Sequence, residues 1–468
     1  MTRPPSISAD LWSTFPPAAQ AVIAAQHERI THLEARIAAL EARLNQTSSN
    51  SSRPPSADPP HAKPAPPRTP SGKRKGGQPG HPKAERPLLP PDVVVPLKPA
   101  RCRRCSGRLA GNDPAPLVHQ VHEVPDARPH VTEYRQHRLS CPGCGVVTCG
   151  ELPADAVGGY GPRTQAVCAL LAGGHRLGKR AVSQVLGDLF GLPISPAAVC
   201  DLQAKTAAAL EPIHAGALAY TRTRPANVDE TGWTEGRAKA WLWVAVTAVV
   251  TAFAIRRSRS RAAFADLSGL TPPVLTTDRY AVYDHLPGDR RQVCWAHLRR
   301  DFQAMIDRAN GGSGVGADLL LHADILLDQW KRVRDGTLTR RGFRQTYLGW
   351  LRAEVRNLLA SGAASTCPRT AGACREILAV EVSLWTFARV DDVEPTNNAA
   401  ERAIRHAVCW RKTSYGTDGE AGSRFVERVL TVVATCRQQG RDVLGFLVDT
   451  VQAARTGATA PSLVPTGV

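Results

Sequence analysis

The chain has 468 residues, which corresponds to about three domains of roughly 150 residues each, and 43% of the residues are apolar. Its 59 Lys and Arg outnumber its 41 Asp and Glu, which gives a net charge of +18. A surplus of this size indicates a polyanionic partner, most often nucleic acid, with a merely soluble basic protein as the alternative.

No membrane or export segment is predicted. The longest uncharged apolar run, residues 240–255, has sixteen residues and is shorter than the ~20 needed to span a bilayer. The N-terminal MTRPPSISADLW lacks the apolar core of a secretory signal. We therefore expect a cytoplasmic protein whose twelve cysteines are reduced or metal-bound rather than paired in disulfides.

A heptad pattern predicts a coiled coil over residues 20–46. Its apolar a and d positions are Ile23, Ile30, Leu33, Ile37, Leu40 and Leu44. Each Arg at a g position (Arg29, Arg36) precedes a Glu at an e position by five residues, so the two can pair across a parallel dimer. Only three heptads are present and Gln26 occupies one d position, so a single amphipathic helix packed on its own protein is the alternative.

Residues 47–100 are predicted to be a disordered, Pro-rich linker, because 15 of the 37 prolines lie between Pro54 and Pro99. Within it, RTPSGKRKGGQPGHPKAER carries six bases and one acid. A flexible basic arm of this kind can follow phosphates without reading sequence, with Lys73, Arg74 and Lys75 as its centre. The alternative is an ordinary solvated run of charges.

Residues 101–150 are predicted to be a small zinc-binding domain. Two Cys-x-x-Cys pairs, Cys102 with Cys105 and Cys141 with Cys144, are separated by 35 residues that alternate like strands. Two such pairs supply four thiolates for a tetrahedral ion. Chance cysteines or a redox pair are the alternatives. Four histidines compete as ligands: His119, His122, His130 and His137.

Residues 160–220 are predicted to be helical and to bind DNA in the manner of a helix-turn-helix. RAVSQVLGDLFG and PAAVCDLQAKTAAALEPI flank the turn LPIS, in which Ser195 suits a helix N-cap and Pro196 the first helical turn. Lys205 is the single base in the early turns of the second helix, so a plain helical connector remains the alternative.

Residues 225–302 are predicted to form the first part of a mixed α/β core. NVDETGW is followed by AWLWVAV and AVVTAFAI, which are predicted to form a buried hairpin, and then by the helical SRAAFADL. A further strand ends at Asp278, and RRQVCWAHLRRDF indicates a strand that continues into a helix. This order places Asp229 on one strand and Asp278 at the end of another.

Residues 391–455 add a third acid, Glu401, on a predicted helix that also carries Arg405 on the same face. Three carboxylates from two strands and a helix can hold two Mg²⁺ (or Mn²⁺) ions ~4 Å apart, an arrangement that serves phosphodiester chemistry. The alternative for each acid is a helix cap or a surface salt bridge, for example between Glu401 and Arg405.

Taken together, these motifs resemble a bacterial DDE transposase of insertion-sequence family sixty-six, the TnpC type. The matching segments occur in the family's order from about Ile23 to Ala454: NSSRPPS, GGQPGH, CRRC, CPGC, DETGW, TTDRYAVYDHL, CWAHLRRDF, TNNAAERAIR and RKTSYGT. The resemblance implies a multidomain chain whose α/β RNase H-like catalytic domain carries an all-α insertion over residues 303–390. It also implies that Asp229, Asp278 and Glu401 are the catalytic, metal-holding acids.

One departure concerns the third acid. Family members usually have Asp before the paired Asn, whereas EPTNN stands here, so Glu394 competes with Glu401 for that role. His297, in the Cys-x-x-His motif with Cys294, is a candidate for positioning the scissile phosphate, and packing is the alternative. With two ligands in sight, a zinc ion is not expected there. Trp330 and Trp350, in the insertion, are expected in its core.

The resemblance implies a transposase that binds element ends, cuts DNA in a metal-dependent step and joins the freed 3′-OH to target DNA. Its partners would be double-stranded DNA, a second copy of the chain and accessory transposition proteins. The chain itself would be associated with the nucleoid when bound to DNA. Phosphates near the acids would be neutralised by Arg299, Arg300, Arg402, Arg405, Arg411 and Lys412. The alternatives are a nuclease that cuts without joining and a dimeric zinc-dependent DNA-binding protein from a decayed element.

Overall fold

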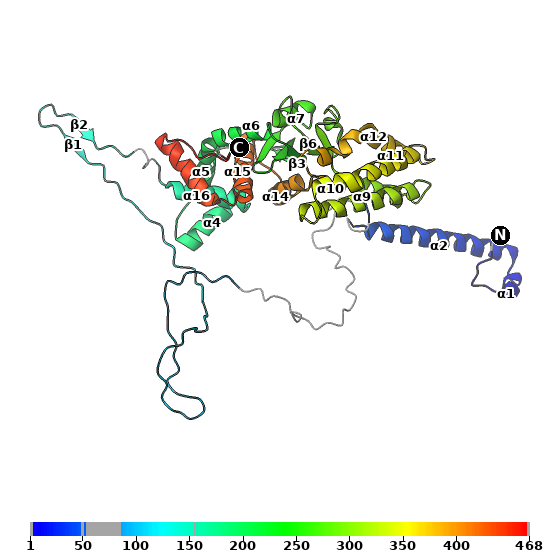
Figure 1. The fold of residues 1–468 in the computed structure, drawn as a ribbon, viewed down its shortest axis with the longest axis horizontal. Helices are drawn as coiled ribbons and strands as arrows, with labels where there is room; N and C mark the ends of the chain where they lie inside the picture. Colours follow the sequence, from blue (N-terminus) through cyan, green and yellow to red (C-terminus); the bar gives the residue numbers. More distant parts are fainter. Residues whose placement is uncertain (1–2, 48–50, 53–85, 154–155, 157, 466–468) are drawn as a thin grey trace.

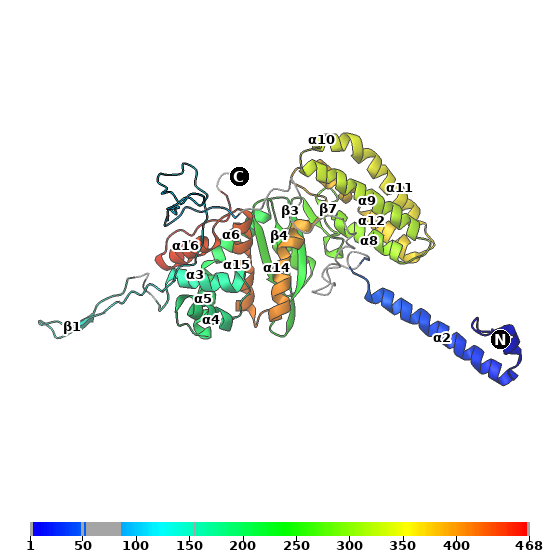
Figure 2. The ribbon, with the colours of Figure 1, turned by 90° about the horizontal axis from the view of Figure 1, so that it is seen from below.

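The computed structural model describes residues 3–47, 51–52, 86–153, 156 and 158–465. It shows a multidomain mixed α/β protein with a helical N-terminal region and a globular part that contains one large sheet (Figures 1 and 2). The N-terminal helices are α1 (Ala9–Ser13) and α2 (Pro17–Leu44). Two short strands, β1 (Arg138–Ser140) and β2 (Val147–Cys149), form an antiparallel hairpin at the end of an extended arm.

The large sheet has five strands in the order β5-β4-β3-β6-β7. Their bounds are β3 (Ala226–Glu235), β4 (Ala238–Val246), β5 (Thr251–Arg256), β6 (Leu275–Thr277) and β7 (Arg291–Val293). The first three strands run antiparallel, whereas β6 is parallel to β3 and β7 is parallel to β6. The predicted buried hairpin is therefore β4–β5, and the predicted Asp278 strand is β6.

The sheet shares one apolar core, which includes Trp243 and Phe253, with helices that come before, between and after its strands in the sequence. These helices are α3 (Pro162–Ala169), η3 (Leu170–Gly174), α4 (Lys179–Phe190), α5 (Pro196–Ala209), α6 (Glu211–Thr221), α7 (Arg261–Ser268), η4 (Ala281–Tyr283), α14 (Asn398–Ser414), α15 (Glu420–Gln438) and α16 (Val443–Thr456). The predicted turn between α4 and α5 is present, and Ser195 caps α5 by accepting a hydrogen bond from Ala198 N at 3.1 Å.

Helix α15 closes the free edge of β5 with polar side chains. Glu427 accepts a hydrogen bond from Ile255 N at 2.7 Å, Thr431 one from Phe253 N at 3.0 Å and Thr435 one from Thr251 N at 3.0 Å. The three helix residues are four apart and share one helix face, and the three strand amides are two residues apart and point to one side of the strand. Each helix side chain therefore lies opposite one strand amide. The exposed edge amides of a strand are thereby satisfied without another strand.

A second apolar core lies in the predicted insertion. Its elements are α8 (Trp295–Asp307), α9 (Ser313–Arg334), α10 (Arg340–Phe343), η5 (Arg344–Leu348), α11 (Gly349–Ala363), α12 (Pro368–Ala379), η6 (Glu381–Leu384) and α13 (Thr386–Arg389). Trp330 is 2% exposed and belongs to this core, as predicted. The expectation for Trp350 was wrong: it is 43% exposed, because α11 turns Leu351, Val355 and Leu359 inward instead.

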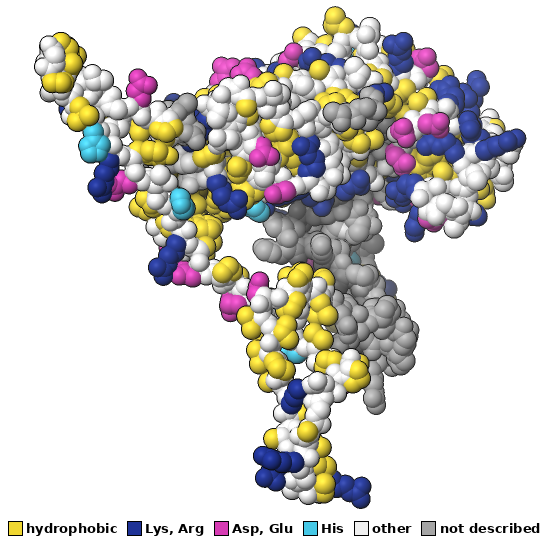
Figure 3. Space-filling model, turned by 60° about the vertical axis from the view of Figure 1, so that its left-hand side comes forward, with side chains coloured by type: hydrophobic (Ala, Val, Ile, Leu, Met, Phe, Trp, Pro, Cys, Tyr) yellow, Lys and Arg dark blue, Asp and Glu magenta, His cyan; other side chains and the backbone are white. Residues whose placement is uncertain are grey.

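The apolar side chains of the predicted heptads are exposed. Ile30, Leu33, Ile37 and Leu40 on α2 are 47–55% exposed, and the helix projects from the globular part (Figure 2). The alternative of a helix packed on its own protein is therefore not what the structure shows. The predicted strands between the two cysteine pairs are also absent from residues 106–137, whose apolar side chains lie exposed along the arm (Figure 3).

Among the residues that the structure describes, no helix is both long and apolar enough to cross a membrane.

Candidate active site

Asp229 and Asp278 lie at neighbouring positions of the sheet, one within β3 and the other just after β6. The register of β3 and β6 pairs Asn227 with Thr276, so Asp229 and Asp278, each two residues further along, occupy adjacent positions. Local backbone amides hold both carboxylates: Asp229 accepts from Glu230 N and Asp278 from Tyr280 N, each at 2.9 Å.

Helix α14 brings Glu401 near the two aspartates, close enough for its charge to act on Asp229. The carboxylate oxygens of Asp229, Asp278 and Glu401 do not all lie within 4.8 Å of one another. The residue at its N-terminus, Asn397, is fully buried, and its side-chain amide donates to Val228 O at 2.8 Å. Its backbone N–H donates to Cys294 Sγ at 3.1 Å. Glu401 follows one turn later, with Glu401 N bonded to Asn397 O at 3.1 Å. The strand of Asp229, the start of α8 and the helix of Glu401 are thus joined through Asn397.

Burial and negative charge act together on Asp229. The pKa of the Asp229 carboxyl is raised to about 8. The largest cause is desolvation of this half-buried side chain, followed by the charge of Glu230 and then by the charges of Asp278 and Glu401. An acid whose pKa is raised by neighbouring carboxylates lies where a cation would be stabilised.

Glu230 points to the opposite face of β3, as expected from strand alternation. Its buried carboxylate is bonded to the Tyr283 hydroxyl and forms an ion pair with Arg259, whose guanidinium lies 3.6 Å from the Tyr280 ring centre. Burial raises the pKa of Glu230 and that of Tyr283. Sequence reasoning missed this cluster, since only the fold brings Arg259 and Tyr283 to Glu230.

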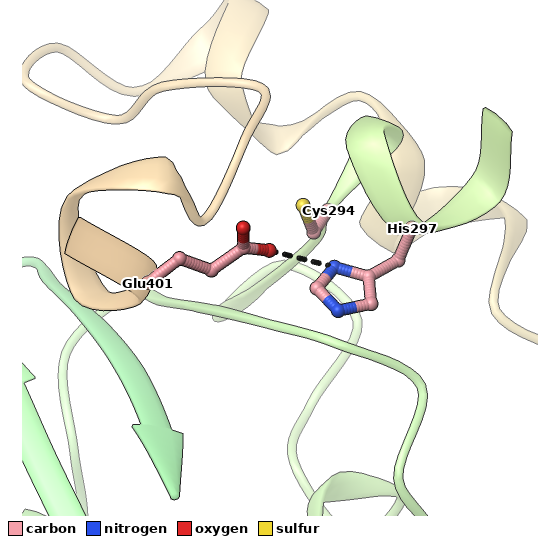
Figure 4. Close-up of side chains that lie close together, drawn as sticks. All are labelled: Cys294, His297 and Glu401. Atoms are coloured by element: carbon pink, nitrogen blue, oxygen red, sulfur yellow. Dashed lines mark ion pairs between the residues drawn. The ribbon is translucent and has the colours of Figure 1, made fainter. Parts of the chain in front are cut away.

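His297 and Cys294 meet Glu401. His297 Nδ1 lies 3.5 Å from Glu401 Oε1, and Figure 4 shows the two side chains pointing toward each other with Cys294 beside them. Within the described part of the chain, this is the single group of three or more Cys, His, Asp or Glu whose ligand atoms all lie within 4.8 Å. The prediction of only two ligands was therefore incomplete, because Glu401 comes from a helix more than a hundred residues away in sequence.

The protonation states of Cys294 and His297 follow from their burial. Desolvation raises the pKa of the Cys294 thiol to about 11, so the sulfur is a neutral thiol that accepts the Asn397 amide. Burial and the charge of Arg300 lower the pKa of His297. The imidazole is therefore neutral at physiological pH and can bind a proton or a metal through a free ring nitrogen.

The predicted basic residues differ in their surroundings. Arg300 lies 3.5 Å from Glu401, whereas Arg299 forms an ion pair with Asp324 at 2.5 Å and Arg411 donates to Gly232 O at 2.5 Å. Arg405 and Lys412 are exposed on α14. The predicted arm residues Lys73, Arg74 and Lys75 lie outside the residues that the structure describes.

The two alternatives for the third acid lie in different surroundings. Glu394 accepts a hydrogen bond from Trp330 Nε1 at 3.0 Å and lines a pocket of about 420 Å³ within the insertion. Glu401 instead faces His297 and Arg300 and acts on the charge state of Asp229. The alternative Glu401–Arg405 salt bridge is replaced by these contacts.

The predicted zinc ligands form two turns of the same shape. Cys102 N bonds to Gly107 O and Cys141 N to Val146 O, both at 2.9 Å, with positive φ at Ser106 (57°) and Gly145 (73°). Backbone amides that point at the first sulfur of each pair lower the pKa of Cys102 and of Cys141. The two pairs do not form one cluster, and the zinc site stays a prediction.

Residues 158–424, more than half of the chain, match a family of transposases. That family is the transposase IS66 family, and the chain belongs to it, which confirms the resemblance noted from the sequence.

Two further similarities cover other parts of the chain. Residues 8–87 match a family of unknown function, DUF6444. A curated relative, the uncharacterized protein y4qI of Sinorhizobium fredii (strain NBRC 101917 / NGR234), is 28% identical over 237 residues. That similarity covers 46% of this chain and 43% of the relative, so it spans less than half of either protein.

Proposed function

We propose that the chain cuts DNA at the ends of an insertion sequence and joins the freed 3′ end to target DNA by a DDE mechanism. The observation that carries this proposal is the proximity of Asp229 in β3, Asp278 just after the parallel strand β6 and Glu401 on α14, whose charges act on Asp229. The site lies in a chain of net charge +18, which suits a polyanionic substrate.

The donor set fits Mg²⁺ or Mn²⁺, because hard divalent cations take carboxylate oxygens. Burial raises the pKa of Asp229 most, and the repulsion from neighbouring carboxylates that adds to it is the kind that a bound cation relieves. Asp229, Asp278 and Glu401 would hold the ions. When bound, such ions lower the pKa of a water and neutralise charge on the attacking and leaving oxygens of a phosphodiester.

The chain's own residues then position the reacting groups. Asn397 fixes the helix of Glu401 against the strand of Asp229, so the carboxylates keep their places while DNA binds. The neutral imidazole of His297 can accept a proton or contact the scissile phosphate. Arg300 brings positive charge next to Glu401. No covalent intermediate between protein and DNA is needed.

We also propose that residues 225–302 and 391–455 form an RNase H-like catalytic core around the insertion 303–390. The mixed sheet order and the placement of the acids support this assignment. End binding is assigned to the zinc-binding residues 101–150 and to the α4–α5 pair. Dimerisation is assigned to α2, whose exposed heptad side chains suit a second copy of the chain.

The test is cleavage of labelled DNA that carries the element's ends, with Mg²⁺ or Mn²⁺, by the unchanged protein and by Asp278→Ala. We expect metal-dependent nicking that leaves a 3′-OH, absent in the variant, and joining of that end to a second DNA. Cutting without joining would favour the nuclease alternative. Specific binding without cutting, also after addition of accessory proteins, would favour the decayed binding protein.

A further inference from the structure

Helix α14 connects the acidic site with the tip of the β3–β4 hairpin. At its start Asn397 contacts Val228, and near its end Arg411 contacts Gly232, so the helix runs along β3 in the direction of the strand. From Glu401 to Tyr415 the helix rises ~21 Å. The strand covers ~20 Å from Asp229 to Glu235. The two lengths agree, and Figure 2 shows α14 lying across the sheet.

The outward face of α14 carries positive charge from the acidic site onward. Arg405 and Lys412 follow Glu401 by four and eleven residues, so all three lie on one face of the helix, and Arg402 lies beside them. Arg402, Arg405 and Lys412 are exposed, and none of the three forms an ion pair with another residue that the structure describes. The nearest following acid, Asp418, forms an ion pair with Lys179 at 3.6 Å.

Tyr415 ends this face in a conformation that tyrosine rarely adopts. It is 81% exposed and caps α14 with φ 61° and ψ 4°, in the left-handed region. A helix commonly ends there in Gly, because a side chain with a Cβ is strained in that region. A large aromatic ring held in solvent on strained backbone indicates a role outside the fold's own packing.

The loop that carries Tyr415 is fixed to the hairpin. Thr417 N donates to Thr234 O at 2.9 Å, and Gly236 N donates to Thr417 O at 2.7 Å. A Cβ at Gly416 would lie 2.1 Å from Thr234 O, so only glycine allows this approach. The exposed hairpin-tip residues Arg237 and Lys239 therefore adjoin Tyr415 and extend the positive surface.

We propose that Arg402, Arg405, Lys412, Tyr415 and the hairpin tip form a contact surface for duplex DNA that leaves the active site. Arginine and lysine bind successive phosphates, and the Tyr415 ring packs on a deoxyribose of the same strand. At 3.4 Å per nucleotide along a strand, ~20 Å places this contact about six nucleotides from the scissile phosphate. The inference rests on the proposed function, since it takes Glu401 as the point of cleavage.

The test is the affinity of the full chain for a fluorescent duplex of arbitrary sequence, measured by anisotropy in EDTA at several salt concentrations. Arg405→Ala with Lys412→Ala should lower the slope of log affinity against log salt by about 0.9 for each lost phosphate contact. Tyr415→Gly should weaken binding at least about fivefold, which corresponds to the lower end of the binding free energies of aromatic contacts with nucleic acid. Its melting temperature should be equal or higher, because glycine relieves the backbone strain.

Matched controls are Lys331→Ala, an exposed lysine of α9, and Trp350→Ala, an exposed aromatic of α11, which should bind as the unchanged protein does. If Tyr415→Gly and the double variant bind with unchanged affinity and slope, the contact surface is overturned while the proposed function stands. If the unchanged protein binds no duplex DNA, both are overturned.

Discussion

The side-chain amide of Asn397 donates to the carbonyl of Val228 at 2.8 Å, across 169 positions of sequence. Val228 directly precedes Asp229, and Asn397 is the residue at which the helix of Glu401 begins. The same Asn397 also joins Cys294 at the start of α8. One buried side chain thus sets the spacing between a strand acid and a helix acid.

Replacing Asn397 by Ala should uncouple the two acids. The Val228 carbonyl loses its side-chain donor, and leaving a buried polar group unpaired costs about 1–3 kcal/mol of folding stability. We expect metal-dependent cleavage to fall at least about tenfold, as for a misplacement of the order of 1 Å. Affinity for DNA should stay within twofold or so. The control is Asn398→Ala, the exposed neighbour, which should cleave normally. Full cleavage by Asn397→Ala would remove this contact from the mechanism.

The pKa of Asp229 makes folding stability depend on pH. With its folded pKa at about 8 and its unfolded pKa near about 4, Asp229 takes up a proton on folding between these values. The free energy of unfolding therefore falls as pH rises through this window. Asp229→Asn cannot ionise, so in EDTA its melting temperature relative to the unchanged protein should rise from about pH 5 to about pH 8.

The control for this measurement is Asp188→Asn, an exposed carboxylate on α4. Its melting temperature should follow that of the unchanged protein at every pH. Parallel curves for Asp229→Asn as well would show that Asp229 is ionised in the folded protein.

The strands and most helices could be predicted because they depend on local patterns. Buried strands such as AWLWVAV and the cap at Ser195 are set by residues close in sequence. The place of Asp278 at a strand end could also be predicted, whereas its position beside Asp229 depends on the pairing of β3 with β6, which the sequence does not specify.

Long-range contacts and packing direction could not be predicted. Nothing near Asn397 in the sequence specifies Val228 as its partner, and nothing near Glu230 specifies Arg259 and Tyr283. The amphipathic pattern of α11 identified a helix but not which side would face the core, so Trp350 was misplaced. The alternation between the cysteine pairs gave only the short strand β1 at the end of the segment, because a strand needs a pairing partner that local pattern does not supply.

The cysteine pairs predict a zinc content that can be measured directly. Purified protein should carry zinc, and Cys102→Ser should lose it, since three thiolates hold the ion less tightly than four. Binding to element ends should weaken, while the circular dichroism of the chain should change little because the sheet lies elsewhere. Cys149→Ser, an exposed bystander, is the matched control and should retain zinc. Equal zinc in Cys102→Ser and the unchanged protein would count against the site.

The exposed heptad residues of α2 predict a dimer. Ile37→Asp places a charge at an a position that a second helix would bury, so light scattering should show a shift from dimer to monomer. Ala35→Asp changes an exposed position on the outer side of the same helix and should leave the mass unchanged. A mass that stays dimeric in Ile37→Asp would place the dimer contact elsewhere.

The edge of β5 gives the last prediction, because Thr431 is both acceptor and donor there. Its hydroxyl accepts from Phe253 N at 3.0 Å and donates to Glu427 O at 2.7 Å. Thr431→Val keeps the shape but leaves the buried Phe253 N–H unpaired, which should lower the free energy of unfolding by about 1–3 kcal/mol in urea. Thr456→Val removes a similar bond within its own helix at an exposed position and should change stability by less than about 0.5 kcal/mol. Equal stability of the two variants would mean that water replaces the threonine at the strand edge, and that α15 protects β5 by covering it rather than by pairing with it.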